Sequence, residues 1–176
     1  MKTKTSFSKQ NRGVLTILFV SIFLLSSASA FAQKSDFSGA WTYTESKSKL
    51  PESGFRMIAT KITVTQNDLT LNIERVSKNR DGDERITKEV ITLDGKECEN
   101  VVYQDRKRKS TATWSADGKS LTINSVMTFE RNGETMEMKS SEVWSLAEDK
   151  NSLTLESTSN GRNGEVKATL VYDKVK

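Results

Sequence analysis

The sequence predicts an all-β protein, a single antiparallel meander of eight to ten strands that closes into an up-and-down barrel. From Phe37 onward, apolar and polar residues alternate in short runs, which is the period of a half-buried strand. The runs are rich in Thr, Ser, Val and Ile, and the breaks between them in Asn, Asp and Gly. No helical period of any length is present. A meander of this size avoids exposed edges by closing on itself.

Residues 1–32 have the composition of a cleavable secretory signal. A basic start that includes Lys2 and Arg12 precedes an apolar run from Val14 to Leu25, and two overlapping small-x-small cleavage sites lie within 28–32. The apolar run is about a dozen residues, whereas a membrane span needs about 20. Cleavage is therefore favoured over a permanent anchor.

Cleavage leaves residues 33–176 as one domain, whose composition limits its chemistry. The signal carries four of the 27 Lys and Arg residues and no acid, so 23 basic residues balance 23 acidic ones in the domain. A neutral domain gives no support for a nucleic-acid partner. Cys98 is the only cysteine, which excludes an intrachain disulfide and a lipid-anchoring thiol near the cleavage site. We expect a periplasmic or secreted domain without an integral membrane span.

Turn signals define the register of most expected strands, because both strands of a correct hairpin place apolar residues on one face. The turns at Asn132–Gly133 and Asp117–Gly118 pair Phe129 with Met136, Met127 with Met138, Ser125 with Ser140, Ile123 with Glu142, Leu121 with Trp144, Trp114 with Leu121, and Ala112 with Ile123. Longer turns pair Leu146 with Leu153, Trp144 with Leu155, Leu155 with Ala168, Leu153 with Leu170, Val64 with Leu69, and Ile62 with Leu71.

Between Ile86 and Tyr103 the register stays open. Apolar pairs such as Val90–Ile91 and Val101–Val102 place apolar groups on both faces, and a bulge would shift the alternation. Cys98 is expected opposite Ile91, as a small buried hydrophobic residue.

The opening Phe37-Ser38-Gly39-Ala40-Trp41 carries a Gly-x-Trp motif that resembles the lipocalin, fatty-acid-binding-protein and avidin group of barrels, the calycins. The closing segment 170–175 is similar to the last strand of fatty-acid-binding proteins, and 37–50 resembles the opening of small secreted bacterial lipocalin-like proteins. The resemblance implies a lipocalin-like barrel with a cavity. It implies no particular ligand, because Leu170 occupies the position of the carboxylate-binding arginine of fatty-acid-binding proteins, although Tyr172 is kept.

The chain contains no histidine, which excludes Ser-His-Asp and Cys-His nucleophilic sites, His-ligated zinc and proximal-His haem. Asp81-Gly82-Asp83 lacks the full spacing of a calcium loop and indicates a hairpin turn. No catalytic residue, metal or cofactor is expected, although an enzyme that uses carboxylates or a tyrosine stays formally open.

Polar side chains on the expected inner face are the candidates for orienting a ligand. A buried Glu142 needs a cationic partner, either Arg108 or a ligand donor, unless a bulge turns it outward. The candidate ligand-binding residues are Arg108, Trp114, Ser125, Met127, Met138, Ser140, Glu142, Trp144 and Tyr172. For the methionines and both tryptophans, plain core packing is the alternative, and Trp41 is expected to seal one barrel end.

Two further segments allow two interpretations each. The basic run 106–109 is either a rim that meets anionic headgroups or an acidic partner, or a solvated turn or strand edge. The segment 45–59 is either a lid, with Phe55 and Met57 over an opening, or an ordinary connection.

The first hypothesis for function is an exported, non-catalytic barrel that binds a small hydrophobic or amphipathic ligand. The alternative is a barrel filled by its own side chains, which acts as a structural or protein-interaction domain of the cell envelope. A barrel of about eight strands can take either form.

Overall fold

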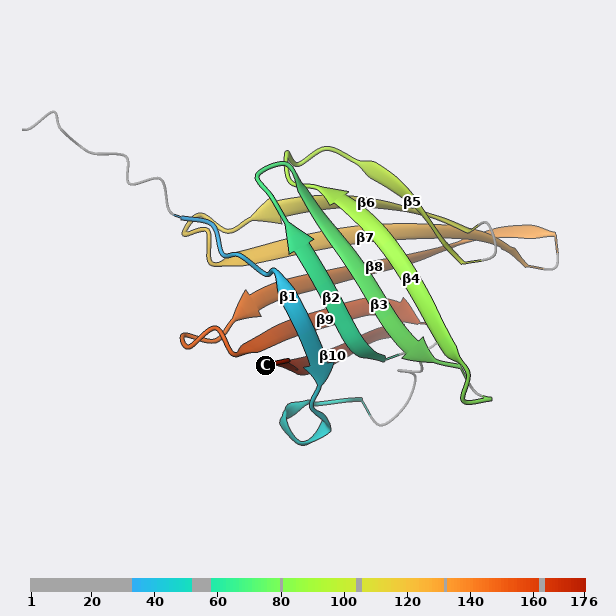
Figure 1. Cartoon of the computed structure of the whole chain (residues 1–176). Helices are drawn as coiled ribbons and strands as arrows, with labels where there is room; N and C mark the ends of the chain where they lie inside the picture. The colour runs from blue at the N-terminus through green and yellow to red at the C-terminus, as the bar shows by residue number, and fades with distance from the viewer. Residues whose placement is uncertain (1–32, 52–57, 80, 104–105, 132, 162–163) are drawn as a thin grey trace, which may run out of the picture. The chain divides into compact units, whose positions relative to one another are not determined.

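The computed structural model describes residues 33–176 except 52–57, 80, 104–105, 132 and 162–163. The described chain is all-β, as predicted, and consists of ten antiparallel strands and one short 3-10 helix (Figure 1). The elements are β1 Gly39–Tyr43, η1 Glu45–Lys47, β2 Ala59–Gln66, β3 Thr70–Lys78, β4 Glu84–Thr92, β5 Cys98–Tyr103, β6 Arg106–Trp114, β7 Ser120–Arg131, β8 Glu134–Leu146, β9 Ser152–Gly161 and β10 Gly164–Lys174.

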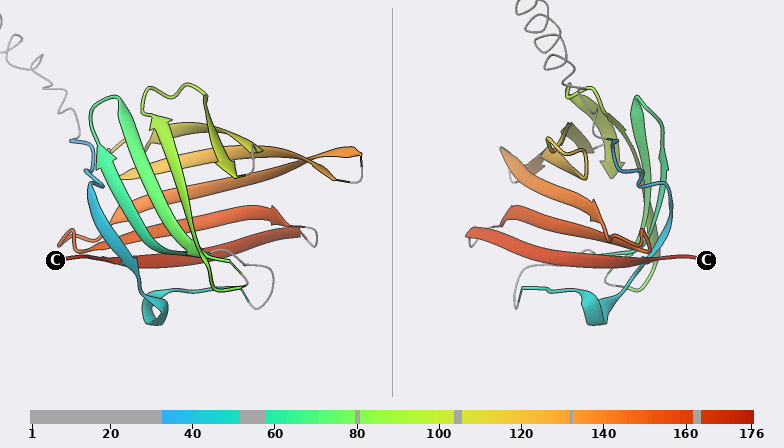
Figure 2. Two further views of the ribbon diagram at one scale, coloured as in Figure 1. Left: turned by 45° about the vertical axis from the view of Figure 1, so that its right-hand side comes forward. Right: turned by 90° about the vertical axis from the view of Figure 1, so that its left-hand side faces the viewer.

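The strands form one sheet in the order β4-β3-β2-β1-β10-β9-β8-β7-β6-β5, which curls into a nearly closed barrel (Figure 2). Pairing of β1 with β10 brings the two ends of the domain together. Within the described chain, β4 and β5 lie next to each other but share no backbone ladder, so the meander leaves a seam between these two strands. Side chains bridge the seam instead. The Asn100 amide both donates to and accepts from the backbone of Val90, and Arg85 donates to the Val102 carbonyl.

One half of the barrel, which we call the packed half, is filled by apolar side chains. Phe37 and Trp41 are fully buried there, and the indole of Trp41 donates to the Phe37 carbonyl at 3.0 Å. Phe37 also stacks on Trp114 and meets Trp144 edge to face. The expectation that Trp41 closes one end of the barrel is consistent with this packing. The cluster further includes Ile62, Val64, Leu71, Ile73, Ile91, Leu93, Ala112, Leu121, Ile123, Leu153, Leu155, Leu170 and Tyr172.

The predicted register is confirmed from β6 to β9, including Met127 opposite Met138 and Glu142 opposite Ile123. It is wrong in two hairpins. In the structure Leu155 lies opposite Leu170, because β9 and β10 continue to Gly161 and Gly164 and leave a shorter turn.

The second error lies between β2 and β3, where Val64 lies opposite Ile73 and Ile62 opposite Arg75. The side-chain oxygen of Asn67 accepts hydrogen bonds from the backbone amides of Leu69 and Thr70, which places Leu69 in the turn, 73% exposed. Both errors are shifts by an even number of residues, so the predicted faces are unchanged.

The segment from Ile86 to Tyr103, whose register the sequence left open, contains a bulge, as its sequence allowed. The β5–β6 pairing shifts between Val101 and Tyr103. Ile91 and Val102 are buried, whereas Val90 and Val101 are exposed. Cys98 lies opposite Ser110 on β6, so the expected pairing with Ile91 is wrong, because β4 and β5 form no ladder.

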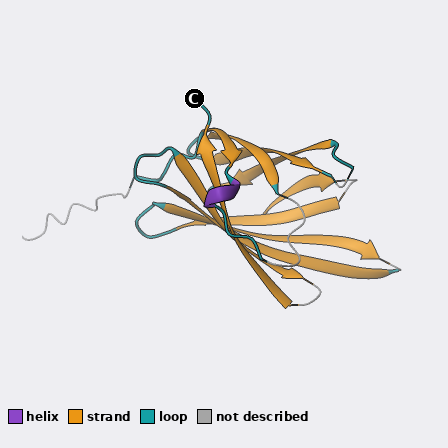
Figure 3. Cartoon of the chain, turned by 90° about the horizontal axis from the view of Figure 1, so that it is seen from below, coloured by secondary structure: helices purple, strands orange, loops and turns teal. Residues whose placement is uncertain are grey.

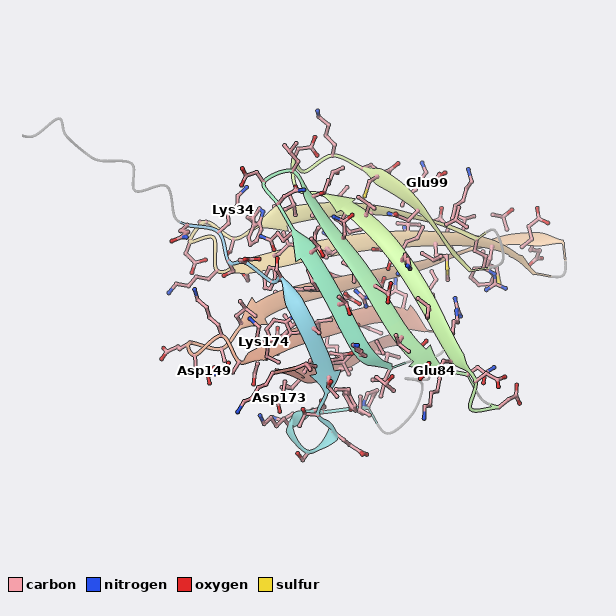
Figure 4. All side chains as sticks on the ribbon, viewed as in Figure 1. Lys34, Glu84, Glu99, Asp149, Asp173 and Lys174 are labelled. Atoms are coloured by element: carbon pink, nitrogen blue, oxygen red, sulfur yellow. The ribbon has the colours of Figure 1, made fainter. Side chains whose placement is uncertain are left out.

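The connection after β1 begins with η1, which lies beside the end of β10 (Figure 3). Asp173 fixes this corner by accepting hydrogen bonds from Lys47, Thr44 and Ser152 (Figure 4). These donors lower the pKa of Asp173 to about 2. The residues expected to form a lid, Phe55 and Met57, lie outside the described residues, as does the predicted signal 1–32.

Candidate functional site

The other half of the barrel, the hollow half, encloses a cavity of about 450 Å³. It lies at the end where β3 and β5 finish and where β4, β6 and β8 begin, which is one end of the barrel because neighbouring strands run antiparallel. Its volume lies in the range of small-molecule sites. The described lining consists of Ala59, Arg75, Ser77, Arg85, Thr87, Glu89, Val102, Arg106, Arg108, Met127, Met138, Ser140 and Glu142.

An ion pair between Arg75 and Glu142 crosses the barrel at this cavity. Its residues come from β3 and β8, which are not neighbours in the sheet. The guanidinium binds the carboxylate through two hydrogen bonds, Nη1 to Oε1 at 2.9 Å and Nη2 to Oε2 at 2.7 Å. The Trp144 indole donates to the same carboxylate at 2.9 Å, and the Arg75 guanidinium lies over the Trp144 ring. This bidentate geometry is the strong form of an arginine–carboxylate contact.

The electrostatics of this pair favour the charged state of both partners. Burial alone would raise the pKa of Glu142, but the charge and hydrogen bonds of Arg75 and the Trp144 donor outweigh it and lower the pKa to about 2. Burial would likewise lower the pKa of Arg75, yet Glu142 holds it raised. Glu142 is therefore an anion, already compensated by a protein cation.

A second ion pair, between Arg108 and Glu89, joins β6 to β4 across the seam. Arg108 Nη1 lies 3.0 Å from Glu89 Oε1, and the Glu89 side chain is only 4% exposed. The two ion pairs therefore connect β3 and β4, on one side of the seam, with β8 and β6 on the other side. They also correct the expectation that Arg108 would compensate Glu142.

The described lining carries more positive than negative charge, since four arginines face two glutamates. Arg85 and Arg106 lie at the ends of β4 and β6, nearer the rim than Glu89 and Glu142. The Arg106 guanidinium also lies 5.3 Å from the centre of the Phe129 ring. Arginines are therefore the majority of the charged side chains in this lining, and their guanidinium groups are donors to which an anionic group could bind.

The residues of the basic run 106–109 alternate between the two faces of β6. The run is therefore neither a single basic surface at the rim nor a wholly solvated turn or strand edge. Arg106 and Arg108 line the cavity, whereas Lys107 and Lys109 point outward and pair with Glu99 and Glu97. The run therefore supplies charge to the interior and places ion pairs on the exterior.

A row of serines lies deeper than the arginines on the same wall. Ser110, Ser125, Ser140 and Ser159 lie directly opposite one another across β6 to β9. Ser110 and Ser125 share a hydrogen bond of 2.8 Å, and Ser110 is fully buried. This row lies beside the cavity, and Ser140 is the member of it that contributes to the described lining.

The structure brings together five of the nine residues that the sequence nominated. Arg108, Met127, Met138, Ser140 and Glu142 line the cavity, and Ser125 lies beside Ser140 in the serine row. The other three, Trp114, Trp144 and Tyr172, lie outside the lining and pack in or against the core cluster. Trp144 still supports the site through its hydrogen bond to Glu142.

Sequence reasoning missed Arg75, Arg85 and Glu89. A signal was present, because Arg75 continues the alternation of Leu71 and Ile73, and Glu89 that of Ile91. Strict alternation would have nominated both as inward-facing. The undefined stretch after Ile86 hid Glu89, whereas the β2–β3 register error did not hide Arg75, because an even shift leaves its face unchanged.

Strand order and cavity together define the class of fold, an up-and-down barrel of antiparallel strands with one hollow half. No protein-family model matches the sequence, and no curated protein matches it. Among solved structures, the zebrafish ileal bile acid-binding protein in complex with cholic acid is similar over 80% of this chain and 100% of its own. The two share 13% sequence identity, with a TM-score of 0.49.

Neither a membrane-spanning helix nor a metal-ligand cluster occurs in the described part of the chain. No helix there is long and apolar enough to cross a membrane. In the same residues, no group of three or more His, Cys, Asp or Glu side chains could hold a metal ion.

Proposed function

We propose that this protein is a non-catalytic binding barrel for a small amphipathic molecule that carries an anionic group. The observation that carries the proposal is the cavity of about 450 Å³ with four arginines and two glutamates in its described lining. Met127, Met138, Val102 and Ala59 supply apolar contacts beside these charges. A mixed lining of this kind matches a ligand with an apolar body and one charged group.

The charges argue against a purely hydrocarbon ligand. Such a ligand would displace water from arginine and glutamate side chains without offering hydrogen bonds in return, which is costly. Arg75 adds a specific donor, because its buried Nε has no hydrogen-bond partner among the described residues. An acceptor on the ligand, or a water held by it, would satisfy this donor.

The cavity also distinguishes the two hypotheses drawn from the sequence. A barrel filled by its own side chains would leave no space of ligand size, yet the described side chains leave about 450 Å³. The alternative was an envelope interaction domain that acts through its rim or an exposed strand, with the basic run 106–109 as one candidate contact at the rim. The arginines of this run line the interior, so ligand binding is the better supported function.

A head-group series tests this proposal by isothermal titration calorimetry of the purified protein with decanoate, decanol and decylammonium. We expect decanoate to bind at least about tenfold more tightly than the other two, because only the anion offers an ionised acceptor for charge-assisted hydrogen bonds from arginine donors, such as the Arg75 Nε that is unpartnered in the described part of the chain. Equal affinities, or a preference for the cation, would overturn the proposal.

Neighbouring residues of β6 offer a matched pair of variants for this series. Arg106→Gln removes a charge from the cavity face, whereas Lys107→Gln removes one from the outer face of the same strand. We expect Arg106→Gln to weaken decanoate binding roughly tenfold and Lys107→Gln to leave it unchanged. Loss of binding in both variants, or in neither, would count against a charged interior site.

We further propose that the domain acts outside the cytoplasm, after cleavage of residues 1–32. This rests on the sequence pattern of that segment alone. N-terminal sequencing of the protein from the native cell tests it, with a start at Gln33 expected. An intact Met1 in the functional protein would refute it.

A further inference from the structure

The hairpin of β7 and β8 extends beyond its neighbours in the barrel (Figure 2). Pairing of β6 with β7 ends at Arg108 opposite Met127, and pairing of β8 with β9 begins at Ser140 opposite Ser159. Within the described chain, residues 128–131 and 134–137 therefore pair only with each other. We call this two-stranded extension the ribbon.

The two faces of the ribbon differ in polarity. Its inner face carries Phe129 opposite Met136, directly beyond the pair of Met127 and Met138 that lines the cavity, and the next pair in the same alternation is Arg131 opposite Glu134, beside the turn. Met136 and Met138 are each 37% exposed, an unusual state for large apolar side chains on adjacent inward positions. The outer face is polar throughout and consists of Thr128, Glu130, Thr135 and Glu137.

The inner face of the ribbon continues the apolar wall of the cavity without a break. Polarity therefore changes along the site. The deep part holds the ion pairs of Glu142 and Glu89 with Arg75 and Arg108. Arg85 and Arg106 lie nearer the rim, and the ribbon adds the apolar pair of Phe129 and Met136. An elongated amphipathic anion fits this gradient in only one orientation, with its charged group at the arginines and its apolar tail along the ribbon.

We propose that the inner face of the ribbon is the tail-binding part of the ligand site and selects ligands by the length of their apolar chain. The inference rests on the proposed function, since it assumes that an amphipathic anion occupies the cavity. Methionine suits this role because its unbranched, polarisable side chain adapts to different tails. Ligands too short to leave the cavity gain nothing from the ribbon, and longer ones gain with each added methylene.

A chain-length series on the purified protein tests the inference, using octanoate, decanoate, dodecanoate and tetradecanoate in calorimetric titrations. Each methylene that reaches the ribbon should tighten binding by roughly twofold to fourfold, the gain expected from partial to full burial of one such group. The variant Met136→Ser removes an apolar contact that lies outside the cavity lining and is already exposed, so the fold is retained.

We expect Met136→Ser to weaken tetradecanoate binding by roughly threefold to tenfold and to leave octanoate binding unchanged. Met136→Leu should restore the wild-type affinity. The matched control, Glu137→Ser, alters the adjacent residue on the outer face and should behave as wild type for every chain length.

The outcomes separate this inference from the proposed function. If no carboxylate binds the wild-type protein, the proposed function fails. If carboxylates bind but Met136→Ser keeps the wild-type dependence on chain length, or if Glu137→Ser loses it equally, the site stands and the role of the ribbon is refuted.

Discussion

Replacing Glu142 with glutamine should destabilise the fold by about 3 kcal/mol at neutral pH. The value follows from the pKa of Glu142, which falls from its ordinary 4.5 to about 2 in the folded protein. At 1.36 kcal/mol for each pH unit, this difference corresponds to about 3 kcal/mol of stability. Because the folded-state pKa is depressed, the contribution is complete above about pH 4.5 and is lost as the pH falls toward about 2.

Urea unfolding at several pH values measures this effect directly. The difference in unfolding free energy between wild type and Glu142→Gln should be about 3 kcal/mol at pH 7 and should shrink toward zero near pH 2. The control Glu74→Gln removes an exposed ion pair with Lys88 and should cost less than about 1 kcal/mol. A difference for Glu142→Gln that is equally small at pH 7, or independent of pH, would refute the reasoning.

Three further predictions concern the fold. Leu69→Ser should change the free energy of unfolding in urea by less than about 0.5 kcal/mol, because Leu69 lies in an exposed turn. A loss of about 2 kcal/mol or more would instead support the register predicted from the sequence, in which Leu69 is buried opposite Val64. Asn100→Ala should accelerate amide hydrogen exchange at Val90 by about tenfold or more, since both hydrogen bonds across the seam are lost, while Asn124→Ala should not. Gly39→Ala should lower the free energy of unfolding by about 1 to 3 kcal/mol, because Gly39 has a φ of +143° and an added Cβ would lie 3.2 Å from Lys174 Cε. An unchanged free energy of unfolding would contradict this backbone conformation.

The regions predicted well are those with tight, two-residue turn signals. Asn132–Gly133 and Asp117–Gly118 define their loops by themselves, so the whole register of β6 to β8 follows from counting outward. Counting alone is enough to place Met127, Met138, Ser140 and Glu142 on one inner wall of the barrel.

The regions predicted poorly are the β2–β3 and β9–β10 hairpins and the contacts across the barrel, although the longer β8–β9 turn was predicted correctly. The turn at Asn67 is set by hydrogen bonds of one side chain, which sequence counting does not reveal. The partner of Glu142 comes from β3, more than 60 residues earlier, and neighbouring-strand reasoning cannot identify such a contact. Sequence therefore identified the carboxylate but not the arginine that compensates it.

The most direct test of the ligand-binding claim is an amide NMR titration of the purified protein with decanoate, which reports on both halves of the barrel at once. We expect chemical-shift changes at residues of the hollow half, such as Ser77, Thr87 and Ser140, and none in the packed half, at Leu121 or Leu153. Changes centred on the packed half or on the outer face, or no change at any concentration below that at which decanoate aggregates, would contradict the account.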